Sequence, residues 1–187
     1  MDKKSQLKKD LEYIDATRKR RGEMASRILE QPGLFGPLLE IALEEDNPIG
    51  SRACWILEFV FKASPVLLYP HLNPFVEGLH KVKPESSIRP LAKICELLTL
   101  AYYDSKNPIS RPPLTEFHKE GLIEACFDWL LEAQKIAPKA YSMQSLYLLG
   151  QDFPWVHGEL RAVLERHYAS GSPGYQARAR KLLDKLP

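Results

Sequence analysis

The chain has 187 residues, of which 44% are apolar and 27% are charged. This composition is typical of a globular domain with a sizeable core, and it excludes a disordered chain. The formal net charge is only +2, which is too small to predict binding to nucleic acid or to a membrane surface by itself.

The three cysteines, Cys54, Cys95 and Cys126, lie far apart, and each is flanked by apolar residues. An odd number of separated cysteines disfavours a disulfide framework and is typical of buried thiols in a reducing compartment. The N-terminal residues are charged and lack the apolar stretch of a signal peptide. No segment approaches the ~18 consecutive apolar residues of a membrane helix. We therefore expect a cytoplasmic protein with no membrane contact.

Apolar residues recur at helical spacing along almost the whole chain, and the breaks fall at Pro, Gly, Ser and Asn. Ser51, Ser87 and Thr115 are expected to cap the helices that follow them, and so is Ser172, with Pro173 at the first helical position. Pro70 is expected to kink or break its helix, as is Pro74. The pattern predicts helices over residues 5–20, 23–30, 34–45, 51–63, 66–82, 87–103, 115–134, 138–149, 155–168 and 174–186.

The predicted helix over residues 51–63 is apolar on nearly every side, and only Arg52, Glu58 and Lys62 interrupt it. A helix at the rim of a globule shows one apolar stripe and one polar face. This helix is therefore expected to lie between other helices on two sides.

The helices recur as pairs with a period of roughly 35–50 residues, which is in the range of helix-pair solenoids. The chain resembles the HEAT-like, armadillo-type helical repeat proteins, including the small bacterial ones. The resemblance is carried by the segments SRACWILEFV, SIRPLAKICELL, YSMQSLYLLG and YQARARKLL.

The fold expected from these repeats is all-α, a right-handed α-α superhelix of about three to four helix pairs. It would form a single domain over residues 1–187, with basic cap helices in 1–31 and a capping half-repeat in 173–187.

Four charged residues stand out because they interrupt apolar helices, and they allow two interpretations. Lone acids in such helices either line a charged groove that binds a partner, or pair with an arginine of an adjacent turn or repeat because an unpaired buried carboxylate is costly. The four residues are Arg52, Glu58, Arg89 and Glu96. Two further candidates for partner binding, Trp155 and His157, follow a proline at a helix start.

The basic N-terminal region offers possible phosphate contacts, and the alternative is a solvated cap helix. The residues concerned are Arg18, Lys19, Arg20 and Arg21. A row of acids at four-residue steps either attracts a basic peptide or forms a solvated helix face. This row is Glu116, Glu120, Glu124 and Asp128.

The sequence lacks the standard signatures of catalysis and metal binding, namely G-x-S-x-G, the Walker loop, G-x-G-x-x-G, H-E-x-x-H and C-x-x-C. It also lacks the Gly-Ser-Ser-x-Met-Pro-x-Lys-x-Asn loop of adenylosuccinate lyase and fumarase-type enzymes. We therefore expect no enzyme, no cofactor and no metal.

The leading hypothesis is a non-catalytic scaffold that binds a protein or peptide, because stacked helical repeats present extended binding surfaces. The alternative is a nucleic-acid binder resembling the DNA-alkylation-repeat proteins, which would place an acid and aromatics in a basic cleft. Asp128-Trp129 is the adjacent pair of that kind. Self-association through the C-terminal half-repeat, with Leu182, Leu183 and Leu186, is a third hypothesis.

Overall fold

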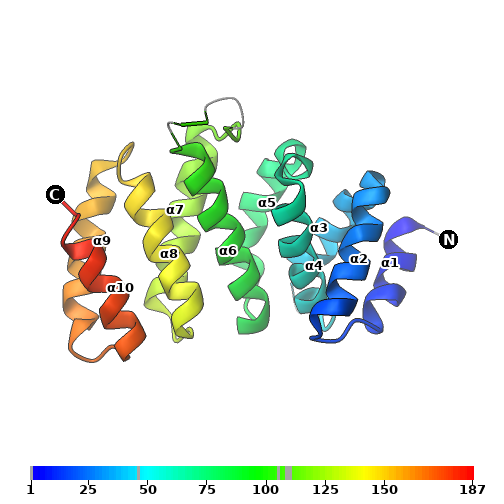
Figure 1. Ribbon diagram of the computed structural model, residues 1–187, viewed down its shortest axis with the longest axis horizontal. Helices are drawn as coiled ribbons and strands as arrows, with labels where there is room; N and C mark the ends of the chain where they lie inside the picture. The colour runs from blue at the N-terminus through cyan, green and yellow to red at the C-terminus, as the bar shows by residue number, and fades with distance from the viewer. Residues whose placement is uncertain (1, 46, 105, 108–110) are drawn as a thin grey trace. The chain divides into compact units, whose positions relative to one another are not determined.

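The computed structural model describes residues 2–45, 47–104, 106–107 and 111–187. Figure 1 shows this part of the chain as successive helices, most of them joined by short connections, and none of its described residues forms a strand. The prediction of an all-α fold is therefore confirmed. The chain divides into two compact units, Met1–Ile94 and Cys95–Pro187, and the division falls inside a helix. The single-domain assignment of residues 1–187 stays a prediction.

The first unit is built on contacts of α2 with α4, of α3 with α4 and of α1 with α3. Its helices are α1 Lys3–Glu12, α2 Arg18–Glu30, α3 Phe35–Leu43, α4 Gly50–Ala63, α5 Leu72–Gly78 and the first part of α6 Glu85–Tyr102. Short 3₁₀ segments join them, namely η1 Pro32–Leu34, η2 Pro65–Leu67, η3 Tyr69–His71 and η4 Leu79–Lys81.

The second unit begins in α6 and is built on contacts of α8 with α7, α9 and α10, and of α9 with α10. Its helices after α6 are α7 Glu116–Leu131, α8 Ile136–Leu149, α9 Pro154–Tyr168 and α10 Pro173–Leu183. Leu182 and Leu186 are buried in this unit. Self-association through the C-terminal leucines stays a prediction, but two of the three do not offer an exposed apolar surface.

Helix α4 has the surroundings that its composition predicts. Ala53, Ile56, Leu57 and Val60 are fully buried, and α4 contacts α2 as well as α3. A helix with such a broad apolar surface needs partners on more than one side, because each exposed methylene would forgo about 0.8 kcal/mol of transfer free energy.

The predicted helix over residues 5–20 is wrong, because the chain turns between α1 and α2. Thr17 is the N-cap of α2, and its Oγ1 accepts a hydrogen bond from the Arg20 N–H at 3.4 Å. The Asp15 carboxylate accepts a second bond from the Thr17 N–H at 2.9 Å. Polar side chains thus end one helix and begin the next without Pro or Gly.

Ser51 does not cap α4, contrary to expectation, because Asn47 organises the preceding turn. Asn47 Oδ1 accepts the N–H of Ile49 at 3.0 Å, and the helix then begins at Gly50. Ser51 Oγ instead lies 2.7 Å from the hydroxyl oxygens of both Ser86 and Ser87. Ser87 is likewise no cap, because α6 already begins at Glu85.

Two other predicted caps are confirmed. Thr115 Oγ1 accepts the N–H of His118 at 3.4 Å at the start of α7, and Ser172 Oγ accepts that of Tyr175 at 3.3 Å before α10. The predicted break at Pro70 is also present, since Pro70 lies in the 3₁₀ segment η3 and residues 66–82 do not form one helix. Pro74 does not break its helix, because it lies in the first turn of the seven-residue α5.

Among the described residues, no single helix has both the length and the apolar character needed to cross a membrane. One pair of segments, Gly50–Ala63 and Pro65–Lys81, meets those criteria together by length and composition alone, and it is bent by 120° at the break.

Candidate functional site

A groove of about 790 Å³ in the first unit brings together four of the predicted site residues. Helix α2 contributes Arg18 and Arg21, α4 contributes Glu58, and α6 contributes Arg89. We call this the basic groove, and its remaining lining residues are Phe59, Lys62 and Ala63. Four cationic side chains therefore face one carboxylate.

Glu58 lines the basic groove and is only 2% exposed. Arg89 Nη2 donates to Glu58 Oε2 at 2.7 Å, and Lys62 Nζ forms a second ion pair with Oε1. Both cations remain partly exposed, with relative side-chain exposures of 37% and 45%. The buried carboxylate of Glu58 is therefore paired with two cations, and those cations remain partly exposed to solvent in the groove.

Arg21 is held over aromatic rings at the side of the basic groove. Its guanidinium carbon lies 5.3 Å from the ring centre of Phe59 and 5.7 Å from that of Trp55. Trp55 is itself oriented by a hydrogen bond from Nε1 to the carbonyl oxygen of Ser86 at 2.9 Å. A guanidinium held over a ring keeps its N–H donors available at its edge, so this arrangement suits recognition of a planar anion.

The other predicted residues of this unit lie outside the basic groove. Arg52 donates from Nη1 to the carbonyl oxygen of Glu12 at 2.8 Å and so satisfies the C-terminal end of α1. Arg20 pairs with Asp15 at 3.5 Å and lines a different hollow, and Lys19 is exposed beside Glu23 at 4.0 Å. The four consecutive basic residues 18–21 therefore do not share one surface: two line the basic groove and two lie outside it.

In the second unit, Glu96 also has an arginine partner from a distant helix. Arg178 Nη2 of α10 lies 3.5 Å from Glu96 Oε1 and donates to Gln144 Oε1 of α8 at 3.1 Å. Glu96 is 6% exposed. This acid is therefore paired across the helices of its own unit, and none of the five hollows described in this structure is lined by it.

Trp155 and His157 face different surroundings although both lie in the first turn of α9. Trp155 is 56% exposed, and its ring stacks on Phe127 of α7 at a centroid distance of 6.2 Å. His157 is half-buried, and its Nε2 lies 2.8 Å from the carbonyl oxygen of Tyr147. Trp155 is thus available to a partner, whereas His157 is engaged within the unit.

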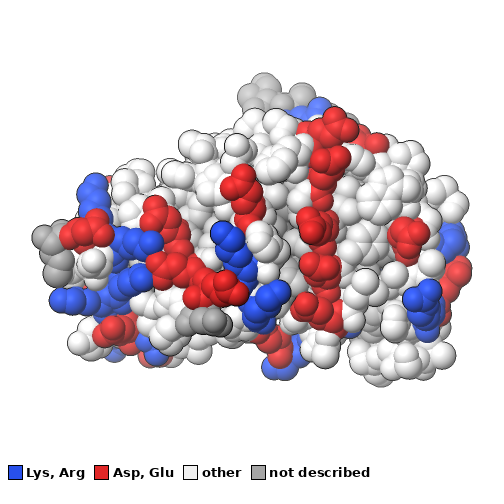
Figure 2. All heavy atoms as spheres, turned by 180° about the vertical axis from the view of Figure 1, so that it is seen from behind, with Lys and Arg blue, Asp and Glu red and all other residues white. Residues whose placement is uncertain are grey.

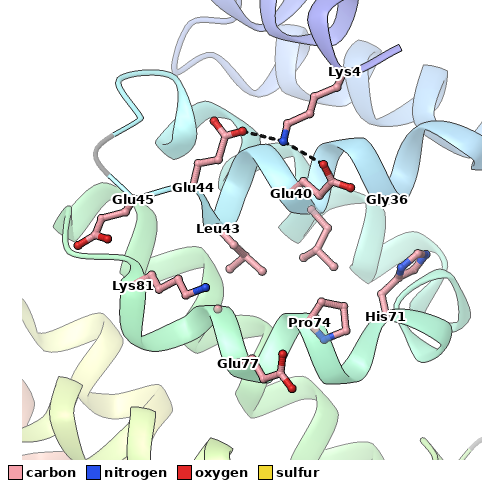
Figure 3. A pocket seen from close by; sticks show the side chains of 12 residues that line it. Lys4, Gly36, Glu40, Leu43, Glu44, Glu45, His71, Pro74, Glu77 and Lys81 are labelled. Atoms are coloured by element: carbon pink, nitrogen blue, oxygen red, sulfur yellow. Dashed lines mark ion pairs between the residues drawn. The ribbon is translucent and has the colours of Figure 1, made fainter. Parts of the chain in front are cut away.

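A second hollow of about 590 Å³ lies on another side of the first unit and was not predicted from the sequence (Figure 3). Lys4 of α1 bridges Glu40 at 2.9 Å and Glu44 at 2.8 Å, while Leu43 and Pro74 face the same space. Burial raises the pKa of Glu44, but hydrogen bonds from Lys4 and Lys8 outweigh it and lower that pKa overall. The spacing of Glu40 and Glu44 by four residues was the available signal.

The chemistry of the basic groove is that of binding. Its groups can form ion pairs, bidentate hydrogen bonds and contacts with a ring face. The part of the chain that the structure describes contains no group of three or more His, Cys, Asp or Glu side chains placed to hold a metal ion. The Asp128-Trp129 pair does not form a cleft, because Trp129 is 2% exposed and packs in the core.

Comparison with known proteins adds one positive result. A sequence model of the HEAT repeat domain matches residues 8–186. Comparisons with curated proteins and with solved structures gave no match. The match covers almost the whole chain, and the described helices follow one another as such repeats require; the protein belongs to the HEAT repeat family.

Proposed function

We propose that this protein is a non-catalytic interaction module whose basic groove binds an acidic segment of a partner protein. HEAT repeats generally mediate protein–protein interactions, which supports a binding role. The observation that carries the proposal is the convergence of Arg18, Arg21, Lys62 and Arg89 beside the ring of Phe59.

The geometry favours a carboxylate-rich peptide that also contains an apolar or aromatic residue. Glu58 forms ion pairs with Arg89 and Lys62, but both cations remain partly exposed. Each therefore keeps N–H donors that a second anion can reach. Arg18 is exposed at the start of α2, and Phe59 supplies a half-buried ring face in the same groove. A segment of alternating acidic and apolar residues would use both kinds of surface.

The test is fluorescence polarisation with a labelled peptide of about 12 residues rich in Asp and Glu with one Phe, compared with its Lys-substituted counterpart. We expect the acidic peptide to bind and the basic peptide not to bind. The double variant Arg18→Glu with Arg21→Glu should weaken acidic-peptide binding by about tenfold or more, because each reversal replaces an attraction by a repulsion.

The matched control is Lys181→Glu with Lys185→Glu, which changes the net charge by the same amount at two exposed lysines of the other unit. If the control variant loses as much affinity as the groove variant, binding depends on overall charge and the proposed site is wrong. Equal binding of the acidic and basic peptides would also contradict the proposal.

A nucleic-acid segment is the second candidate for the same groove, since its cations and ring face also suit phosphates and bases. The test is a salt titration with duplex DNA of about 20 base pairs and with a single strand of the same length. Binding that falls steeply between about 50 and 200 mM salt, and whose salt slope falls in the groove variant, would support it. No binding at about 50 mM salt would exclude it.

A cytoplasmic location is part of the proposal and rests on Cys54, Cys95 and Cys126, all of which are buried free thiols. Location can be measured directly by fractionating cells that express the tagged chain.

A further inference from the structure

The outer face of α7 carries acidic and apolar side chains side by side. Glu116, Glu120, Glu124 and Asp128 are exposed at four-residue steps, and Glu132 continues the row just after the helix. Figure 2 shows Asp and Glu side chains gathered in one column on the side of the molecule where α7 lies. At a rise of about 1.5 Å per residue the row is about 24 Å long.

Large apolar side chains lie on the same face of α7. Helical periodicity places Phe117, Phe127 and Leu131 among the acids of the row. Phe117 is 49% exposed and Leu131 is 53% exposed, while the half-buried Phe127 is stacked by Trp155 of α9. A single exposed apolar residue is ordinary, but several large ones sharing one exposed helix face indicate a docking surface.

The lysine of α7 itself is paired with an acid outside the row. Lys119 is 12% exposed, and its Nζ lies 2.6 Å from the carboxylate of Asp152. It also lies over the rings of Tyr102 and Phe153, at 5.4 and 5.5 Å. On α9, Glu159 is exposed one turn beyond Trp155 and lies on the same side of that helix.

We propose that this face, made of the α7 acids with Phe117, Leu131 and Trp155, docks a basic amphipathic segment of a partner protein. Charge complementarity selects the partner: Lys and Arg side chains would pair with the row, while apolar side chains between them would cover the exposed rings. The row would accommodate a helix of about four turns. Phosphate-rich partners such as nucleic acid or an anionic membrane would be repelled. This surface is separate from the basic groove. It would bind a basic segment, whereas the basic groove would bind an acidic one.

The experiment uses the full chain and a labelled peptide of about 18 residues with Lys or Arg and Leu at helical spacing. We expect saturable binding that weakens between about 50 and 200 mM salt. Glu120→Gln with Glu124→Gln should weaken it about fivefold to tenfold, and Trp155→Ala should weaken it by at least as much, because aromatic anchors dominate such interfaces. Circular dichroism and urea unfolding verify that each variant is folded.

The control is Glu12→Gln with Glu30→Gln, which removes the same two charges at exposed positions of the other unit. Its affinity for the peptide should match that of the wild type. Absence of binding to the wild type would overturn the proposal, as would equal losses in the control and the α7 variant. Sedimentation of the chain alone tests another occupant: if the wild type self-associates and Trp155→Ala does not, the face is covered by a second copy and the proposed partner is wrong.

Discussion

The imidazole of His157 contacts Tyr147 of the preceding helix in two ways. His157 Nε2 lies 2.8 Å from the carbonyl oxygen of Tyr147, and the two rings stack with their centroids 5.8 Å apart. Gly150 at the end of α8 makes room for it. A Cβ on Gly150 would lie 2.0 Å from His157 Cδ2, although the backbone there has ordinary helical geometry.

Gly150→Ala is therefore expected to displace the ring and to lower the free energy of unfolding by about 1–3 kcal/mol, through lost contacts and a broken hydrogen bond. Gly158 of α9 is the matched control, since a Cβ there meets nothing within 4 Å. Gly158→Ala should raise stability by about 0.5–1 kcal/mol. Urea unfolding measures both changes, and equal stabilities of the two variants would show that the His157 ring moves aside without cost.

Arg89→Ala should destabilise the first unit by about 1–2 kcal/mol, because Glu58 then keeps only Lys62. The expected loss is smaller than for a fully buried pair because Arg89 is partly exposed. Replacing both partners, as Glu58→Met with Arg89→Met, should recover most of the loss. Arg18→Ala, at an exposed position of the same groove, should change the free energy of unfolding by less than about 0.5 kcal/mol. A double variant less stable than Arg89→Ala would contradict this account.

Protonation of His118 should weaken the start of α7. Its Nδ1 accepts the N–H of Thr115 at 3.0 Å, and burial lowers the pKa of His118 below the ordinary value of about 6.5. Since the folded state favours neutral imidazole, this contribution to stability is complete above about pH 6.5 and is lost as pH falls through the lower pKa of the folded state.

His118→Gln tests this pH dependence, because glutamine at this position supports a capping box without titrating. The variant should retain the stability of the wild type to within about 1 kcal/mol at pH 7.5 and should flatten the pH dependence of stability below about pH 6.5. His118→Ala loses the acceptor at every pH. The measurement is urea unfolding across this pH range, and an unchanged slope in the glutamine variant would refute the assignment.

The thiols should be unreactive in the folded protein. Burial raises the pKa of Cys54 to about 12 and raises that of Cys95 well above its usual range. Because the thiolate is the reacting species, a disulfide reagent at about pH 8 should modify the native chain only at the rate of its unfolding. In denaturant all three thiols should react at once. A thiol that reacts rapidly in the native protein would show that one of these side chains is accessible.

The local features of the fold were predictable where one side chain decides them. Thr115 and Ser172 cap their helices because the hydroxyl oxygen of each accepts the backbone N–H of the residue three positions later, and Pro173 suits the first helical position after Ser172. Ser51 had the same appearance, but Asn47 four residues earlier forms the turn instead. The break before Thr17 was not predicted, because side-chain hydrogen bonds of Asp15 and Thr17 form it and neither Pro nor Gly marks it in the sequence.

The basic groove could be predicted only in part. Glu58 and Arg89 were identifiable singly, because charges in apolar helices need partners, and their pairing fits that requirement. Their meeting with Arg18 and Arg21 depends on how α2 packs against α4, which no local pattern specifies. The acids of α7 and Trp155 were identifiable in the sequence, but the exposure of Phe117 and Leu131 among those acids was not.

The acidic face of α7 also has an energetic consequence for the helix that bears it. Successive like charges at four-residue spacing oppose helix formation by about 0.2–0.5 kcal/mol per pair, and the part of the row inside the helix, from Glu116 to Asp128, contains three such pairs. The helix persists because its other side packs against α8. Salt or a bound polycation would screen this repulsion and stabilise α7. Binding of a cationic partner at the proposed docking face would therefore also remove an unfavourable interaction within the helix that bears it.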